Sequence, residues 1–395
     1  MSPSERGRRA AGLDGLRGLA ALSVVCFHVW LYRFPDPTHV RRRGVLDYVL
    51  SDFRHGLLLF FVLSGYLLYR GFARAALRGD GFVDVRQYLR RRVARVVPAY
   101  YLAMLGTFVL LWGAGGTPGV RLPAHQGDLV LFLFFAQNYS SHTVLTFNPV
   151  TWTLCLEVLF YALLPVFGIA AYRWSRGLAR RQALALLALL GLGLAWNAGV
   201  FLLGGSLVAA KALPAYLPYF ALGMLVALWV ESGGAWLGRL ATVALVLGGA
   251  LCVAGNALWH SGGGASAVPL AGATLQDLLA GIGFAALVAA VVAGRGVAAS
   301  WTRFRPLAAL GLVSYGVYLW HLPLMLFGAR LHLLPQAFVP RLIVVLLPAL
   351  AAGTASWLLV ERPLLAAASR GARSRSRGRT SRRRIGAALD ARAAP

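Results

Sequence analysis

Long apolar stretches recur from about residue 13 to about residue 360, separated by short polar or basic connections. Crossing a hydrocarbon core of roughly 30 Å takes about 20 apolar residues in a helix. Each stretch is long enough, and no soluble core needs so many. The pattern therefore predicts an all-α integral membrane protein with about ten transmembrane helices. We expect them at residues 13–33, 55–73, 96–112, 149–172, 182–203, 213–230, 237–258, 271–293, 306–328 and 340–360.

One apolar segment, at residues 128–140, is too short for a crossing and favours a re-entrant or interfacial segment. Charge supports this interpretation, because a crossing here would turn a later basic cluster outward. That cluster is Arg173, Arg176, Arg180 and Arg181. Cytosolic loops are enriched in arginine, so we predict that both termini are cytosolic. An exception is the run Arg41, Arg42 and Arg43, which this topology leaves outside.

The charge balance is strongly basic, with 39 Lys+Arg against 13 Asp+Glu and a net charge of +26. In a soluble protein this would suggest nucleic acid. Here 58% of the residues are hydrophobic and the arginines cluster between spans and in the tails. We therefore expect anionic lipids, and no nucleic acid, as their partners. The three cysteines lie in apolar stretches, which argues against a disulfide framework.

The same pattern divides the chain into three parts. Residues 1–12 form a basic cytosolic tail, and residues 13–364 form the membrane domain. Residues 365–395 are an Arg/Ser-rich, low-complexity cytosolic tail, expected to be disordered or lipid-bound.

Ionisable side chains inside a bilayer are costly and are functional candidates by default. The first span contains Asp14, Arg17 and His28. Arg17 and His28 project within roughly 20° of each other, and Asp14 within roughly 60°, but His28 lies roughly 16 Å further along the helix. A structural polar stripe is one interpretation. The other makes His28 a general base, because histidine exchanges protons near neutral pH.

Arginines near the cytosolic ends of two spans are candidate phosphate contacts. Arg92 and Arg95 are three residues apart and share a helix face, and arginine suits bidentate phosphate binding. Without other context, ordinary positive-inside charge is the better explanation of these two arginines. Arg70 is either an anchor or a phosphate contact, while Ser64 and Gly65 in the same span favour close helix packing.

Later spans carry further buried polar groups. Glu157 is the only acid in its span, and pairing with His28 would orient the imidazole; another structural partner is the alternative. Ser314, Tyr318 and His321 lie three or four residues apart and form a stripe. We expect Glu157 and His321 to match the depth of His28 and outline a cavity. No metal-ligand spacing such as HExxH occurs, so we expect no metal.

Several motifs together resemble the membrane-bound acyltransferase family 3, the O-acetyltransferase-like proteins that modify bacterial surface sugars, lipids and some antibiotics. The resemblance covers about residues 13–363. It rests on LDGLRGLAAL with the Arg17-to-His28 spacing, FFVLSGYLL, RRVARVVPAYY, NPVTWTLCLEVLFY, SYGVYLWHLPLM and the closing ERP at 361–363.

The resemblance implies an acyl-CoA donor, acetyl-CoA by default, bound from the cytosol, with no permanent cofactor. The acceptor would be a hydroxyl of a glycan, lipid-linked sugar or glycoside, and the location the bacterial cytoplasmic membrane. It implies that His28 is catalytic, with Arg17 in the same motif, and that Glu157 matches the acid of the family's tryptophan–glutamate motif. Arg92 and Arg95, with Arg70, would bind the CoA part. We expect the acceptor cavity to be lined by His321, Tyr318, Ser314, Asp14 and Trp152.

One departure concerns Val158 and Leu159, where many family members carry Glu and Gln. The extracellular esterase-like domain that some members carry is also not found in this sequence. Two other classes fit the same physics. A transporter or flippase also places polar groups in the membrane, although no internal repeat is evident, and a non-catalytic scaffold would leave the buried His28 and Glu157 unexplained.

Overall fold

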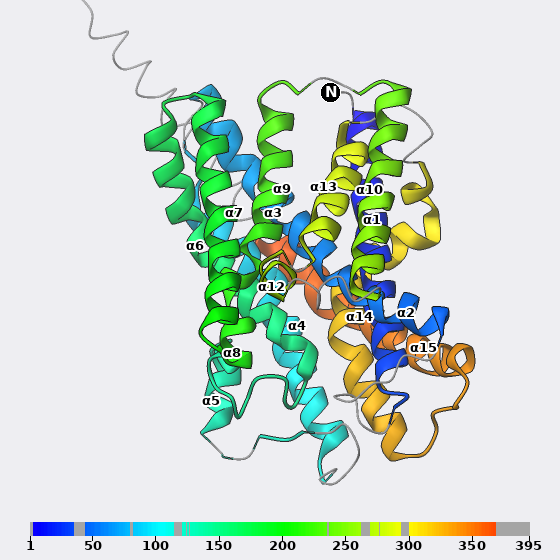
Figure 1. The fold of residues 1–395 in the computed structure, drawn as a ribbon. Helices are drawn as coiled ribbons and strands as arrows, with labels where there is room; N and C mark the ends of the chain where they lie inside the picture. Colours follow the sequence, from blue (N-terminus) through cyan, green and yellow to red (C-terminus); the bar gives the residue numbers. More distant parts are fainter. Residues whose placement is uncertain are drawn as a thin grey trace, which may run out of the picture.

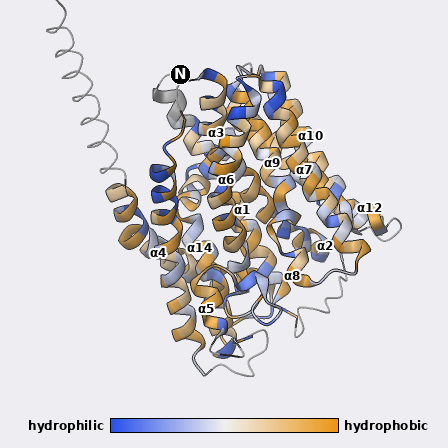
Figure 2. Ribbon diagram, turned by 90° about the vertical axis from the view of Figure 1, so that its left-hand side faces the viewer, coloured by the Kyte–Doolittle hydropathy of each residue, from blue (hydrophilic) through white to orange (hydrophobic). Residues whose placement is uncertain are grey.

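The computed structural model describes residues 3–34, 44–79, 82–113, 121–123, 125, 127–234, 237–261, 269–275, 277–293 and 300–368. These residues form a helical bundle without strands (Figure 1). In this part of the chain, ten helices are long and apolar enough to cross a membrane. The predicted all-α, multi-pass membrane fold is therefore confirmed. Apolar residues cover most of the helical length, with hydrophilic segments mainly towards the ends (Figure 2).

The long helices are α1 (Pro3–Leu31), α3 (Gly56–Arg78), α4 (Val85–Leu111), α6 (Trp152–Ser175), α7 (Ala179–Leu202), α9 (Leu213–Glu231), α10 (Arg239–Ser261), α13 (Leu278–Ala293), α14 (Arg305–Arg330) and α15 (Phe338–Ser356). Shorter ones are α2 (Val45–Asp52), α5 (Asp128–Leu133), α8 (Leu207–Ala210) and α12 (Pro269–Thr274). A π turn, Trp357–Glu361, follows α15.

The segment predicted to be re-entrant or interfacial forms no helix of crossing length. It contains only the six-residue α5 and a 3-10 turn at Gln137–Tyr139. Asn138 in that turn is buried, and its Nδ2 donates hydrogen bonds to the carbonyl oxygens of Trp152 (2.8 Å) and Lys211 (3.0 Å). Irregular backbone at membrane depth needs such internal partners. The segment thereby joins the start of α6 to the start of α9.

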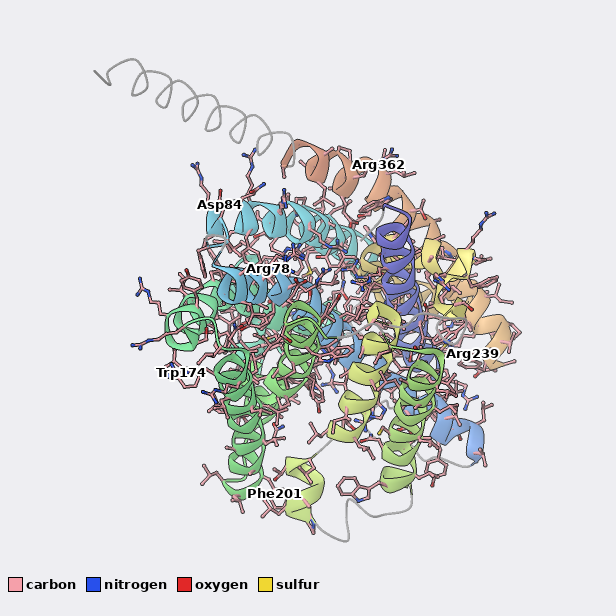
Figure 3. The ribbon with its side chains drawn as sticks, turned by 90° about the horizontal axis from the view of Figure 1, so that it is seen from above. Arg78, Asp84, Trp174, Phe201, Arg239 and Arg362 are labelled. Carbon is pink, nitrogen blue, oxygen red and sulfur yellow. The ribbon has the colours of Figure 1, made fainter. Side chains whose placement is uncertain are left out.

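Two helix starts differ from the prediction. α1 begins at Pro3, inside the predicted tail, and α4 begins at Val85 rather than near residue 96. Asp84 caps α4 by accepting a hydrogen bond from the backbone N–H of Gln87. Arginine is a good helix former, so the basic connection between the predicted spans 55–73 and 96–112 is helical for most of its length. Arg78 and Asp84 lie on either side of the short connection between α3 and α4 (Figure 3).

Other predicted features fall on parts of the chain that are not described. Arg41, Arg42 and Arg43 lie outside the described residues, as do residues 369–395 of the predicted C-terminal tail.

Small residues bring the central helices into contact. A Cβ added at Gly311 of α14 would overlap the carbonyl oxygen of Asp14 in α1. A Cβ at Gly65 of α3 would overlap the carbonyl oxygen of Phe220 in α9. Glycine allows such close backbone approach in membrane bundles. The predicted packing role of Gly65 is confirmed, and these contacts fix the register of the helices that carry the candidate site.

Candidate active site

A narrow cavity lies between α1, α3, α4, α6 and α14. It encloses about 70 Å³. Its lining combines aromatic and aliphatic side chains with a polar set drawn from all five helices. The polar members are Arg17, Ser64, Arg92, Arg95, Thr153, Glu157, Tyr161, Ser314, Tyr315 and Tyr318. We call this space the arginine cavity.

The three guanidinium groups of the arginine cavity outnumber their acidic partners. Arg17 forms an ion pair with Asp14 at 3.5 Å. The Nε of Arg92 is buried and has no hydrogen-bond partner among the described residues, and its guanidinium lies 6.0 Å from the centre of the Tyr161 ring. No hydrogen bond or ion pair joins the Arg95 guanidinium to a described residue. Such a group of cations with unused donors suits an anionic ligand.

Glu157 lines the arginine cavity and is held by two hydroxyl groups. Its Oε2 accepts a hydrogen bond from Tyr161 (2.7 Å), and its Oε1 accepts one from Ser64 (3.1 Å). The predicted pairing of Glu157 with His28 is therefore wrong in this structure. Glu157 shares its surroundings with Arg17, not with the two histidines. Ser64 consequently has a polar role in addition to packing.

The structure brings His28 and His321 together from α1 and α14. His28 Nδ1 lies 3.2 Å from His321 Nε2 and 2.9 Å from the carbonyl oxygen of Val24. His321 Nδ1 lies 3.2 Å from the carbonyl oxygen of Val317. A carbonyl oxygen only accepts, so both Nδ1 atoms carry protons. His321 Nε2 is then the acceptor facing His28.

This tautomer assignment leaves Nε2 of His28 unprotonated. That nitrogen has no hydrogen-bond partner among the described residues, and the His28 ring is only half-buried. His321 is fully buried. His28 therefore presents a proton-accepting nitrogen, and His321 occupies the orienting position that a carboxylate holds in other histidine-based sites.

Tyr318 links the histidine pair to the arginine cavity. Its ring lines the cavity and lies 5.9 Å from the ring of His321. Its hydroxyl is 2.8 Å from the Thr153 hydroxyl and donates to the carbonyl oxygen of Val150. His28 and His321 are not among the side chains that line the arginine cavity itself. The two histidines therefore lie outside the arginine cavity, and the Tyr318 ring connects His321 to it.

Three further predicted site residues lie elsewhere. Arg70 pairs with Glu231 at 3.0 Å and does not line the arginine cavity, so the structure does not bring it to Arg92 and Arg95. Asp14 is the ion-pair partner of Arg17 rather than a lining residue. The ring of Trp152 faces the ammonium of Lys211.

Some lining residues were not singled out by the sequence. Tyr161, Thr153 and Tyr315 are ordinary membrane-helix residues, and only their helical spacing from Glu157 and Tyr318 hinted at a role. Glu361, in the closing ERP motif, is buried in the π turn and accepts a hydrogen bond from Ser356. π turns often occur at functional sites. Among the described residues, no cluster of three or more His, Cys, Asp or Glu side chains could hold a metal ion.

Comparison with known proteins identifies the family. Residues 10–360 match the family described as "Acyltransferase domain", and the chain belongs to it: this is the membrane-bound acyltransferase family 3. The peptidoglycan O-acetyltransferase OatA of Listeria monocytogenes is 22% identical over 382 residues, which cover 89% of this chain and 55% of that protein.

A second relative is the O-acetyltransferase OatA of Staphylococcus aureus, 27% identical over 203 residues, or 47% of this chain and 29% of that protein. The chain thus spans about half or less of the length of these curated relatives. No solved structure matches it.

Proposed function

We propose that this protein is a membrane-embedded O-acyltransferase that moves a short acyl group from cytosolic acyl-CoA to a hydroxyl of a sugar-containing acceptor. The single observation that carries the proposal is the histidine pair, because it leaves Nε2 of His28 free to accept a proton. Family membership and the names of the relatives support the reaction class. The bacterial cytoplasmic membrane is the location we expect.

The arginine cavity is the proposed donor site. Phosphate groups of CoA would lie on Arg92 and Arg95, whose guanidinium donors are largely unused. The arginine cavity is narrow, at about 70 Å³. The thin pantetheine arm would pass through it towards Tyr318, and the nucleotide would stay at the mouth.

The proposed chemistry is direct transfer assisted by His28. The thioester would have to extend past Tyr318 to the histidine pair. There Nε2 of His28 takes the proton from the acceptor hydroxyl as the hydroxyl oxygen attacks the thioester carbonyl carbon. The carbon–sulfur bond then breaks, the acyl group stays on the acceptor oxygen, and the CoA thiolate takes the proton back from His28. His321 Nε2 accepts from the Nδ1–H of His28 and so stabilises the imidazolium that forms in between.

The proposal is tested by His28→Ala, with His332→Ala as the matched control because His332 is exposed on a loop. Acetyl-CoA and acceptor-containing membrane extract are supplied to purified protein in lipid nanodiscs, and release of free CoA is measured. Loss of a general base lowers the rate by roughly 10²- to 10⁴-fold. We expect that loss for His28→Ala only. Near-normal turnover of folded His28→Ala would contradict the proposed role.

A further inference from the structure

A second cavity lies near α8, in the half of the bundle opposite the N-terminal end of α1 (Figure 1). It encloses about 470 Å³, within the roughly 300–1,000 Å³ typical of small-molecule sites. Its polar lining is Arg54, Asn197, Lys211, Tyr216, Tyr219 and Asp277. We call this space the Lys211 cavity. Under the predicted topology it faces the outer side.

The charges that line the Lys211 cavity do not balance. Arg54 donates two hydrogen bonds to the carboxylate of Asp277, at 3.0 and 3.2 Å, so these charges offset each other. Lys211, the only lysine in the sequence, has no carboxylate partner among the described residues. Its Nζ donates to the Tyr216 hydroxyl at 3.3 Å. An ammonium has three donors, so Lys211 keeps donor capacity for a ligand beyond its bond to Tyr216.

The position of the Lys211 ammonium is set by its surroundings. Its Nζ lies 4.1 Å from the centre of the Trp152 ring, a cation–π contact. The buried Asn138 side chain bonds the backbone carbonyls of both residues, which fixes Lys211 relative to Trp152. The Tyr216 ring packs 5.1 Å from that of Trp152. A fixed, half-buried cation is a stronger anion site than a mobile surface lysine.

An aromatic contact joins the linings of the two cavities. The ring of Tyr216, in the Lys211 cavity, lies 5.3 Å from that of Phe61, which lines the arginine cavity. Trp152 lies beside this contact at the start of α6, the helix that carries Glu157. If the arginine cavity holds the donor, the Lys211 cavity offers a separate space for the second substrate.

We propose that the Lys211 cavity binds the acceptor and that Lys211 pairs with an anionic group, a carboxylate or a phosphate, carried by the acceptor saccharide. This inference rests on the proposed function. The anionic group would lie away from the reacting hydroxyl, which must reach past the aromatic contact to the thioester. Lys211 is therefore a binding residue that selects the acceptor, and it takes no part in the proton transfer.

The test compares three probes that share one sugar: methyl β-D-glucoside, methyl β-D-glucuronide and the 6-phosphate of methyl β-D-glucoside. Binding to the full protein in nanodiscs is measured by calorimetry for the wild type, Lys211→Met and Lys211→Arg. We expect the wild type to bind one of the anionic probes about tenfold tighter than the neutral one, as a charge-assisted hydrogen bond predicts. Which anion binds tighter identifies the carboxylate or the phosphate as the natural group.

Lys211→Met should remove the preference for an anion, and Lys211→Arg should retain part of it. The inference is overturned if the wild type shows no preference, if the preference persists in Lys211→Met, or if no probe binds. Acetyl-CoA binding is measured on the same samples and should be the same in all three proteins. If the wild type does not bind acetyl-CoA, the proposed function is contradicted. If it binds acetyl-CoA normally but shows no preference for an anionic probe, only the inference about Lys211 is contradicted.

Discussion

The contact between His321 and His28 gives a quantitative prediction. His321→Leu removes the acceptor that faces Nδ1 of His28 at 3.2 Å, while the carbonyl oxygen of Val24 stays in place. In the transition state that Nδ1–H belongs to an imidazolium, and hydrogen bonds of charged groups contribute about 1.5–3 kcal/mol. At about 1.36 kcal/mol per tenfold, kcat should fall about 10- to 150-fold.

The assay separates positioning from simple structural damage. Release of free CoA is followed in nanodiscs at varied acetyl-CoA, so that kcat and KM are obtained separately. The KM for acetyl-CoA should stay within about twofold, because neither histidine lines the arginine cavity. His321→Gln should recover much of the rate, since its side-chain oxygen can accept where Nε2 did. The positioning role of His321 is refuted if His321→Gln lowers kcat as much as His321→Leu does, or if folded His321→Leu protein retains full kcat.

Two further variants test the donor site and the packing, each against a matched control. Arg95→Gln should raise the Kd of acetyl-CoA about tenfold, because it removes a charge-assisted hydrogen bond to phosphate. The same change at the exposed Arg90 should have little effect on that Kd. Equal effects of the two variants in calorimetry would contradict the proposed donor site. Gly311→Ala places a methyl group on the Asp14 carbonyl and should reduce the yield of monodisperse protein in size-exclusion chromatography, whereas Gly248→Ala, with nothing within 4 Å, should not.

The membrane fold could be predicted because hydrophobic length is a local property of the chain. Each of the ten predicted spans overlaps a candidate membrane span of the described residues, with 271–293 covered by α12 and α13. The short segment at 128–140 forms no crossing helix. The start of α4 could not be predicted from hydropathy, because its first turns are polar and arginine-rich. A helix cap at Asp84 was the available signal.

The relation between helices was harder to predict than the helices themselves. Residue counting along each span predicted that His28, Glu157 and His321 share one cavity. The structure pairs the two histidines but gives Glu157 other partners. Register between neighbouring helices is set by contacts such as Gly311 on Asp14, which no spacing within one helix encodes.

The partners of Arg70 and Lys211 show the same limit. Arg70 meets Glu231 at the end of α9, a residue 161 positions away. Lys211 meets Trp152, which a turn in another part of the chain holds in place. Neither partner follows from a motif, because each depends on how α9 packs against α3 and α6.

In the proposed reaction, the acyl group of CoA ends on a hydroxyl of a separate acceptor. The most direct measurement supplies acetyl-CoA carrying a ¹³C-labelled acetyl group to membranes containing either the wild type or His28→Ala at equal protein levels. Extracted glycans, lipids and glycosides are then compared by mass spectrometry. We predict a labelled acetyl ester in amounts matching the CoA released, present with the wild type and lost with His28→Ala. Release of CoA without any labelled acceptor, or equal labelling by both proteins, would contradict the account.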